Sequence, residues 1–559
     1  MNTNFKPLGL VAAVAAASAG YAGVVNAAAS VAAETELGDL ALVPYYTVMD
    51  GYSTGVNIIN SSNKTQVLKF RFRRAVDSMD ALDFNVVLSP EDMYTGFLSQ
   101  GEGGKIFWTS NDNSCVAPAY GNLTAADNQF ELPAIYSIGA ETGYIEVISM
   151  GSPITEKAPI AVAAKHDSDG VPANCTLVRD NFFQNDARTL FLGQFDPSLT
   201  PKELEDVKAD LAKAEAQRGV IDSDTTHQRG TDKEGKILTT VVASDYEASP
   251  DSLKVSYFIK SDETGVEFGD NAVHIAEFLD DAAMTNQQTG LFSGDLKGFD
   301  YPDLNGSSPL DAPGAGRTKY NELRDILGAS LLINDWSRNS VESLGATVDT
   351  DWVVTFPGQY VMLNLGAYLK LGGISGAAPD CLRSPATAAA NTANSNNPAW
   401  VPLTPCDTRD IPVAANFSVY DREEQGITVE EGELVVSPQP PSTSVEYALK
   451  DEVNVIQWGE SSVLNAPVNI SIPTPDGAKF GWASLSTTSS KNLALCDIDF
   501  TNEDEDGDSD PQYLCNIAAT GSVPVIGFAA WQRAFTANPG SNYGRIVEHS
   551  RTQAAASAD

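Results

Sequence analysis

The fold class is indicated by one stretch, Gln66-Val67-Leu68-Lys69-Phe70-Arg71-Phe72-Arg73. Apolar Leu68, Phe70 and Phe72 alternate with the basic side chains, so the two sets fall on opposite faces of an extended chain. This period of two predicts a β-strand whose apolar face lies in a core. For the basic cluster Lys69, Arg71, Arg73 and Arg74, the sequence leaves two interpretations. It is a solvated strand face, or it pairs with acidic residues of a neighbouring domain or molecule.

Strand signals of the same kind recur along the whole chain, and Gly, Pro and Asn turns separate them. They lie at 40–48, 55–60, 82–88, 144–150, 352–356, 416–420, 453–458, 468–472, 482–486 and 523–531. Short strands at close spacing are typical of β-sandwiches. We therefore predict a mainly β protein of tandem antiparallel β-sandwich domains, immunoglobulin-like, with loop and helical insertions. Helical signals follow the capping box Thr200–Glu203 and occur in 273–283 and 319–333.

The length of 559 residues predicts two or three domains. We expect strands 144–150 and 330–336 to be neighbours in one sheet. A first β-sandwich domain would then span 38–365 and carry a large insertion at about 151–329. A loop-rich linker at 366–411 would lead to a second β-sandwich domain at 412–559.

The first 27 residues are typical of a secretory signal peptide. Lys6 precedes an apolar run from Leu8 to Val25, and Val25-Asn26-Ala27 offers a cleavage site. No later stretch approaches the ~20 apolar residues that a membrane helix needs. The sequence predicts an exported protein at the cell surface or in the extracellular medium, with no transmembrane segment in the mature chain; the periplasm stays open.

The chain is strongly acidic, with 35 Lys and Arg against 74 Asp and Glu, a formal net charge of −39. A surface of this charge repels nucleic acid and anionic lipid. We therefore expect no nucleic-acid partner. The same charge attracts divalent cations or keeps the protein soluble.

An acidic loop at 502–510 is the best candidate metal site. Alternating oxygen ligands with Gly507 at the sixth position are typical of the start of an EF-hand loop, in which calcium takes about 6–8 oxygens. Asn502 at position one and Tyr513 at position twelve depart from that pattern. The sequence leaves two interpretations, a weak calcium site and a solvated acidic loop. The candidate ligands are Asn502, Asp504, Asp506, Asp508 and Asp510.

Six cysteines in an exported chain predict structural disulfides, although six allow 15 pairings. Nearest-neighbour pairing is favoured, because each pair brackets a polar, loop-like insert. The predicted pairs are Cys115–Cys175, Cys381–Cys406 and Cys496–Cys515.

Catalytic signals are weak. The segment Gly51–Gly55 matches the G-x-S-x-G nucleophile elbow around Ser53, but a strand follows where a helix is required. His166, His227, His274 and His549 form no zinc-binding motif. The turn Asp167–Gly170 is interpreted as a polar turn, with a weak cation loop as the alternative. We predict no enzymatic activity.

Seven segments carry a resemblance to known sequences: Leu42–Thr47 (LVPYYT), Val56–Asn60 (VNIIN), Leu82–Pro90 (LDFN and LSP), Thr350–Pro357 (TDWVVTFP), Tyr420–Glu424 (YDREE), Glu452–Ile456 (EVNVI) and Val525–Phe528 (VIGF). In this order they resemble a group of exported proteobacterial proteins described as hypothetical or surface-layer-like. The resemblance is silent over 196–340 and 365–412. It implies export and a β-rich body, and it brings no catalytic residues with it.

These patterns favour an exported cell-surface structural or adhesive protein. Edge strands and acidic loops, with calcium as a candidate bridging ion, would mediate self-association or attachment to a cell-surface component. The alternative is an extracellular module that binds carbohydrate or another ligand through Trp108, Trp352 or Trp400. A secreted hydrolase comes third.

Overall fold

The computed structural model describes most of the chain between residues 37 and 553, and the fold is mainly β, as predicted. Its large sheets consist of antiparallel pairs, except for one parallel pair. The described residues are 37–182, 226–283, 302–361, 413–499 and 512–553, apart from 77, 79, 121–127, 133–136, 138, 229–239, 243–245, 307–317, 342–344, 359–360, 428–443, 450, 461, 468, 488–493 and 518–522.

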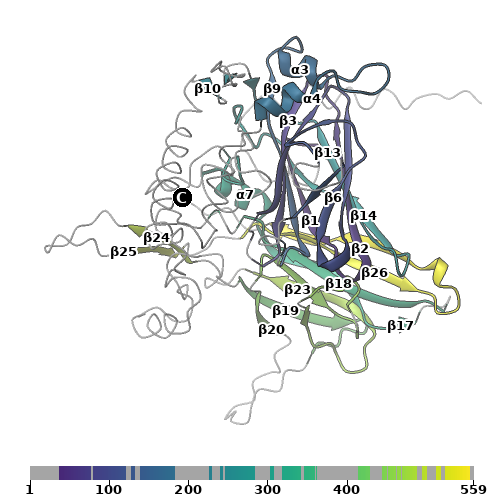
Figure 1. Ribbon diagram of the computed structural model, residues 1–559. Helices are drawn as coiled ribbons and strands as arrows, with labels where there is room; N and C mark the ends of the chain where they lie inside the picture. The colour runs from purple at the N-terminus through teal and green to yellow at the C-terminus, as the bar shows by residue number, and fades with distance from the viewer. Residues whose placement is uncertain are drawn as a thin grey trace, which may run out of the picture.

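Two sheets face each other and enclose the core of a first sandwich (Figure 1). Leu68, Phe70 and Phe72 point into this core, as their alternation predicted, and the ring centroids of Phe70 and Trp108 are 5.1 Å apart. One sheet has the order β15 (Val273–Ile275), β1 (Leu40–Thr47), β9 (Thr142–Pro153), β3 (Gln66–Arg74), β4 (Asp80–Leu88) and β7 (Cys115–Ala117), with β12 (Tyr246–Glu247) added to β9. The other has the order β14 (Glu267–Asn271), β13 (Leu253–Ser261), β2 (Tyr52–Asn60), β5 (Met93–Gln100), β6 (Ile106–Thr109) and β8 (Gln129–Glu131).

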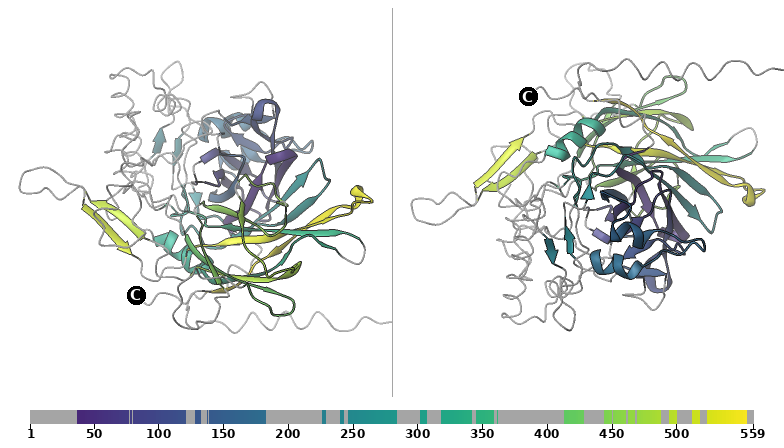
Figure 2. Two further views of the ribbon diagram at one scale, coloured as in Figure 1. Left: turned by 90° about the horizontal axis from the view of Figure 1, so that it is seen from below. Right: turned by 90° about the horizontal axis from the view of Figure 1, so that it is seen from above.

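Two further sheets form a second sandwich, whose strands cross those of the first at a steep angle (Figures 1 and 2). Trp336, Trp352 and Trp458 meet in its core, where the centroids of Trp352 and Trp458 are 5.0 Å apart. One sheet has the order β20 (Ser444–Leu449), β19 (Val413–Asp421), β23 (Phe480–Ser486), β16 (Ala329–Ser337) and β28 (Ser550–Gln553). The other has the order β22 (Asn469–Ser471), β21 (Val453–Gln457), β18 (Thr347–Thr355), β26 (Ile526–Ala534) and β27 (Tyr543–Glu548), with β17 (Ser340–Val341) on β18.

The two sandwiches share their apolar cores. The core of the first takes in Val353, Val455 and Phe528 from the second sandwich. In return, Leu40 and Leu42 of β1 belong to the core of the second. Because apolar burial continues across the boundary, the sandwiches pack as one body.

Hydrogen bonds also cross this boundary. The Tyr52 hydroxyl donates to the carbonyl of Val463 at 2.7 Å. The Thr355 hydroxyl donates to the carbonyl of Pro44, also at 2.7 Å. Both bonds are buried, so polar groups at the junction are satisfied by the partner sandwich.

The expected pairing of strands 144–150 and 330–336 is wrong. β9 is flanked by β1 and β3 over most of its length, so both of its edges are occupied. β16 instead pairs with β23 and β28. Strand pairing thus joins segment 329–355 to strands that follow residue 412.

Helices are few in the part of the chain that the structure describes. They are α3 (Pro159–Ala164), α4 (Cys175–Phe182) and α7 (Thr318–Leu327), with 3₁₀ turns η1 (Met49–Gly51), η2 (Glu102–Gly104) and η6 (Pro539–Ser541). α7 confirms the first part of the helix expected at 319–333, but β16 begins at Ala329. The helix expected at 273–283 is wrong, because this segment opens with β15. The helix expected after Thr200 lies outside the described residues.

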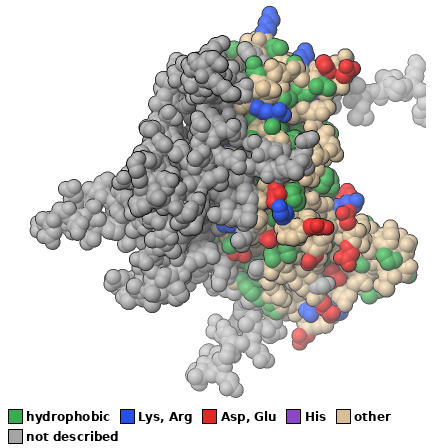
Figure 3. Space-filling model, viewed as in Figure 1, with side chains coloured by type: hydrophobic (Ala, Val, Ile, Leu, Met, Phe, Trp, Pro, Cys, Tyr) green, Lys and Arg blue, Asp and Glu red, His purple; other side chains and the backbone are tan. Residues whose placement is uncertain are grey.

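Two hairpins lie outside the four large sheets. The hairpins are β10 (Thr226–Gln228) with β11 (Thr240–Val242), and β24 (Ala494–Asp499) with β25 (Gln512–Ile517). Figure 3 shows acidic and basic side chains interspersed over the described part of one face. Within the described ranges, we find no helix with the length and apolar character needed to cross a membrane.

Candidate functional site

The basic face of β3 is buried. We call Lys69, Arg71, Arg73, Asp83 of β4 and Glu146 of β9 the charged row; all five side chains are 0% exposed. Register places Arg71 directly opposite both Asp83 and Glu146. The solvated-face interpretation is therefore wrong for these three basic side chains. Their acidic partners lie on adjacent strands of the same sheet, and not in a neighbouring domain or molecule as the alternative supposed. The nitrogen–oxygen distances are 3.2 Å for Lys69–Asp83, 3.9 Å for Arg71–Asp83, 3.2 Å for Arg71–Glu146 and 3.3 Å for Arg73–Glu146.

The charged row reaches residues far along the chain. Arg71 donates to the carbonyl of Pro302 at 3.1 Å. The Tyr144 hydroxyl donates to Glu146 at 3.0 Å and lies 3.3 Å from a carboxylate oxygen of Glu452. Ions without access to solvent are stable only when paired, so we assign this row a structural role rather than a chemical one.

A second polar site lies in a cavity of about 470 Å³ where the two sandwiches meet. We call it the seam cavity. β14 and β27, which both contribute to its lining, approach each other closely: a Cβ on Gly544 of β27 would lie 2.5 Å from the ring of Phe268 on β14. Its polar lining includes Tyr257, Asp270, His274, Glu548, His549 and Arg551.

Both histidines of the seam cavity are engaged in structural hydrogen bonds. His274 Nε2 accepts from the amide of Val255 at 2.8 Å. His549 Nε2 lies 3.0 Å from the carbonyl of Val353, and its Nδ1 lies 3.0 Å from Asn334 Nδ2. Burial lowers the pKa of each imidazole to about 4, so both are neutral at pH 7. They shape the cavity wall rather than supply a proton or a base.

The carboxylates and the phenol give the seam cavity its electrostatic character. Partial burial raises the pKa of Glu548, and the nearby charge of Asp270 raises it further. The pKa of Tyr257 is raised well above its usual value, first by burial and then by the charges of Asp270 and Glu548. The three groups therefore lie close enough in the cavity lining for their charges to act on one another.

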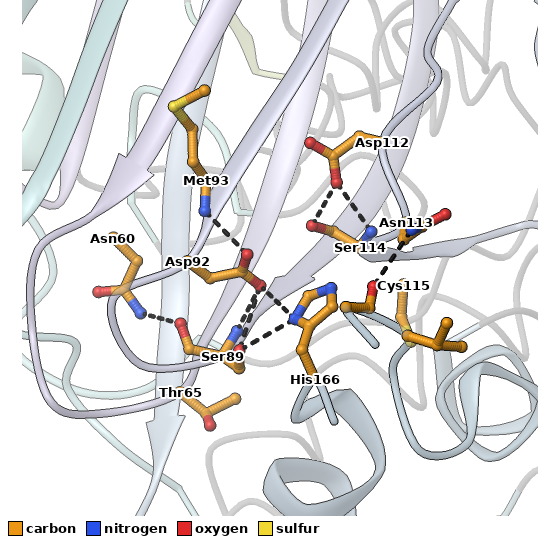
Figure 4. Close-up of polar contacts among 12 residues, drawn as sticks. Asn60, Thr65, Ser89, Asp92, Met93, Asp112, Asn113, Ser114, Cys115 and His166 are labelled. Carbon is orange, nitrogen blue, oxygen red and sulfur yellow. Dashed lines mark hydrogen bonds and ion pairs between the residues drawn. The ribbon is translucent and has the colours of Figure 1, made fainter. Parts of the chain in front are cut away.

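A serine, a histidine and an aspartate meet beside the disulfide end of the first sandwich (Figure 4). His166 Nδ1 lies 3.4 Å from both the Ser89 hydroxyl and Asp92 Oδ2. In a catalytic triad, serine and aspartate contact opposite ring nitrogens. Here they share one nitrogen, and Asp92 also accepts from the amide of Ser89 at 3.1 Å. This geometry stabilises a turn and does not activate a nucleophile.

Most of the predicted metal and disulfide residues lie outside the described residues. The candidate calcium ligands Asn502, Asp504, Asp506, Asp508 and Asp510 lie outside them, between β24 and β25. Cys381 and Cys406 also lie outside them. Cys496 and Cys515 are register partners in the β24–β25 hairpin, so their predicted pairing remains a prediction with a compatible backbone. The Cys115–Cys175 disulfide is confirmed.

Other candidates have structural roles. Ser53 lies inside the continuous strand β2, which confirms that the G-x-S-x-G match lacks the elbow geometry. Asp167 accepts from the amides of Asp169 and Val171, which makes the 167–170 segment a polar turn. Trp108 and Trp352 are fully buried and cannot serve as ligand platforms, while Trp400 lies outside the described residues.

No group of three or more His, Cys, Asp or Glu side chains within the described ranges could hold a metal ion. Sequence reasoning missed the seam cavity altogether. Its lining comes from strands about 290 positions apart, and no local pattern marks them.

Comparisons with family models, with curated proteins and with solved structures give no match to this chain.

Proposed function

We propose that this chain is an exported structural or adhesive protein of the cell surface. The observation that carries the proposal is the shared core of the two sandwiches, with Val353 and Phe528 in one core and Leu40 in the other. A body joined in this way resists relative motion of its halves, which suits a protein that transmits load or spaces partners. The signal-peptide pattern of residues 1–27 and the acidic composition support export.

Self-association through strand edges is the mode of assembly that we propose. β20 and β28 are the terminal strands of one sheet, and each has one strand neighbour within the described residues. An edge strand offers unpaired backbone groups to a second chain. Calcium held by the 502–510 loop would screen the repulsion between molecules of formal net charge −39.

Light scattering and negative-stain microscopy test this proposal on oxidised, signal-free protein, first in chelator and then in millimolar calcium. Ordered sheets or filaments that appear with calcium are the expected result. A monodisperse monomer under both conditions would contradict calcium-driven assembly.

A matched pair of variants locates the calcium effect. Asp504→Asn/Asp506→Asn/Asp508→Asn removes three charges from the candidate loop and should abolish assembly. Asp262→Asn/Glu423→Gln/Glu424→Gln removes the same number of charges from exposed positions and should leave assembly intact. If the two variants assemble to the same extent in calcium, the effect of calcium depends on net charge and not on the 502–510 loop.

A further inference from the structure

We propose that Lys69 of β3 and Asn85 of β4 are joined by an intramolecular amide bond, an isopeptide cross-link between two adjacent strands. The two residues are direct register partners in the antiparallel β3–β4 pair. Opposed side chains in such a pair lie on one face of the sheet, with Cβ atoms about 4.5–5.5 Å apart. The four-carbon side chain of lysine is long enough to bring its amine to the asparagine amide. This inference is independent of the assembly proposal, because the bond forms within one chain.

A carboxyl group lies beside the amine. Asp83 is two positions before Asn85 on β4, so their side chains lie on the same face of the sheet. Lys69 Nζ lies 3.2 Å from Asp83 Oδ2. The side chains of Lys69, Asp83 and Asn85 are all 0% exposed, so bulk water does not compete with the amine. An amine nucleophile, an amide and a proton carrier are the groups that an amide exchange requires.

The neighbours of this pair on three sides are apolar. Ile148 of β9 is opposite the lysine, and Ala117 of β7 is opposite the asparagine. Two positions along the strands, Val67 faces Val87. All four side chains are buried. Apolar surroundings disfavour ions relative to neutral groups, so they favour transfer of a proton from the ammonium to the carboxylate beside it. Desolvation in an apolar site is one way in which proteins make a lysine amine nucleophilic.

The reaction balances without an oxidant or a co-reactant. The ammonium of Lys69 gives one proton to Asp83, and the lone pair of Nζ attacks Cγ of Asn85. Asp83 passes that proton to Nδ2 of Asn85, and the bond between Cγ and Nδ2 breaks. Nζ then gives up a second proton through Asp83, so the nitrogen of the asparagine side chain leaves as ammonium. One ammonium group is consumed and one ammonium ion is released, and Asp83 returns to its carboxylate form.

Arg71 compensates the carboxylate of Asp83 after the reaction. Its guanidinium lies 3.9 Å from Asp83 Oδ2, and it stays charged when Lys69 becomes part of a neutral amide. The ion pairs of Glu146 take no part in the step. The cross-link therefore makes the structural role of the charged row permanent, because it joins β3 to β4 covalently.

Intact mass spectrometry tests for the bond. Oxidised protein without residues 1–27 is checked for folding by tryptophan fluorescence. It is then denatured and fully reduced, so that disulfides do not enter the mass balance. We expect a mass about 17 Da below the value calculated from the sequence, because one ammonia is lost. Folded protein with the full calculated mass would overturn the proposal.

Tryptic mapping locates the bond, because trypsin does not cleave after an acylated lysine. The expected product is segment 65–71 joined to segment 75–105, with a branch at Asn85 on fragmentation. Segment 75–105 also contains Asp83. A branch at Asp83 with a loss of about 18 Da, the mass of water, would make Asp83 the electrophile and overturn the assignment.

Matched variants identify the two partners, each measured against its own calculated mass. Lys69→Met and Asn85→Ala should both show the full calculated mass. Lys105→Met removes a lysine whose side chain is 57% exposed and should keep the loss of about 17 Da. A loss of about 17 Da that persists in Lys69→Met or Asn85→Ala would overturn the pair. The wild-type peptide map decides on the bond even where a variant does not fold.

A second pair of variants tests the carboxyl group. In Asp83→Ala the proton carrier is missing, and we expect less than about a tenth of the purified chains to be joined. Asp83→Glu retains a carboxyl group beside the amine and should restore the cross-link. Folding of both variants is checked by tryptophan fluorescence. A complete cross-link in folded Asp83→Ala would overturn the proton transfer through Asp83.

Discussion

The guanidinium of Arg71 lies 3.2 Å from the carboxylate of Glu146, and both side chains are fully buried. Arg71 also reaches the carbonyl of Pro302 at 3.1 Å, more than 200 positions along the chain. The strand β3 alternates charged and apolar side chains. Its apolar face packs against the opposing sheet, and its charged face contacts a segment far along the chain. The buried charges of this face are stable because each lies within ion-pair distance of an opposite charge. A buried pair is favourable only when each charge is compensated.

Removing Arg71 should therefore destabilise the protein strongly. Arg71→Met leaves Asp83 and Glu146 with less positive charge beside them, and we expect a loss of about 3–5 kcal/mol in the free energy of unfolding. Lys105→Met breaks the pair between Lys105 and Glu131, which is partly exposed, and should cost less than about 1 kcal/mol. Urea unfolding followed by tryptophan fluorescence measures both. Similar losses in the free energy of unfolding of the two variants would show that burial does not increase the contribution of these ion pairs to stability.

Asp351 should contribute stability that falls as the pH rises from about 4 to about 7. Burial raises the pKa of this carboxyl to about 7 in the folded state, against an ordinary value of 3.8. The folded state then binds more protons than the unfolded state between about pH 4 and 7, so its stability is greatest below that window and is lost as pH rises through 7. Burial raises the pKa of Asp39 to about 7 as well, so it acts in the same direction.

Asp351→Asn should reduce this pH dependence without loss of structure. Oδ2 accepts from the Ser462 hydroxyl at 2.6 Å and from the amide of Leu464 at 3.0 Å, and the retained amide oxygen can accept both. We expect stability at pH 8 equal to or above that of the wild type, and a slope of stability against pH between pH 5 and 7 that is more positive than that of the wild type. Thermal unfolding across this range measures it. An unchanged slope would assign the titration to other groups.

His274 and His549 should act in the opposite direction to Asp39 and Asp351, because their contribution to stability falls as the pH falls. Both histidines have a pKa lowered to about 4 in the folded state, below the ordinary 6.5. Between these values the unfolded state binds protons that the folded state does not, so stability present above pH 6.5 is lost as pH falls towards 4. We expect a measurable change in the slope of the free energy of unfolding against pH between about pH 4 and 6.5. In the Asp39→Asn/Asp351→Asn background, His274→Gln should reduce this slope by up to about 1.4 kcal/mol per pH unit, as measured by urea unfolding at each pH. Its slope between pH 7.5 and 8.5 should match that of the background and serves as the control.

Opening the Cys115–Cys175 disulfide should loosen α4 more than the sandwich cores. The bridge spans 60 residues and ties the start of α4 to β7. Cys115→Ala/Cys175→Ala should cost about 2–4 kcal/mol. Hydrogen exchange should show faster exchange in α3 and α4 first, with the Phe70 and Trp108 core protected. Uniform loss of protection would indicate that the bridge supports the whole sandwich.

Local sequence was enough to predict the mainly β class, the inward face of β3 and the pairing of Cys115 with Cys175. Each depends on a local feature: an alternation of period two, or a pair of cysteines around one polar insert. Such patterns depend only on the backbone geometry of neighbouring residues. They can therefore be interpreted without knowing how the rest of the chain packs.

What lies opposite each face and edge depends on contacts between segments that are distant in sequence. The same alternation fits a solvated or a buried row of Lys69, Arg71 and Arg73, and acids on β4 and β9 resolve the choice. β16 pairs with β23 rather than β9, because the edges of β9 are already taken. The seam cavity joins Tyr257 to Glu548 across almost 300 positions. Periodicity predicts which side chains share a face of a strand. Which element packs against that face depends on long-range contacts, and no single segment of the sequence specifies these contacts.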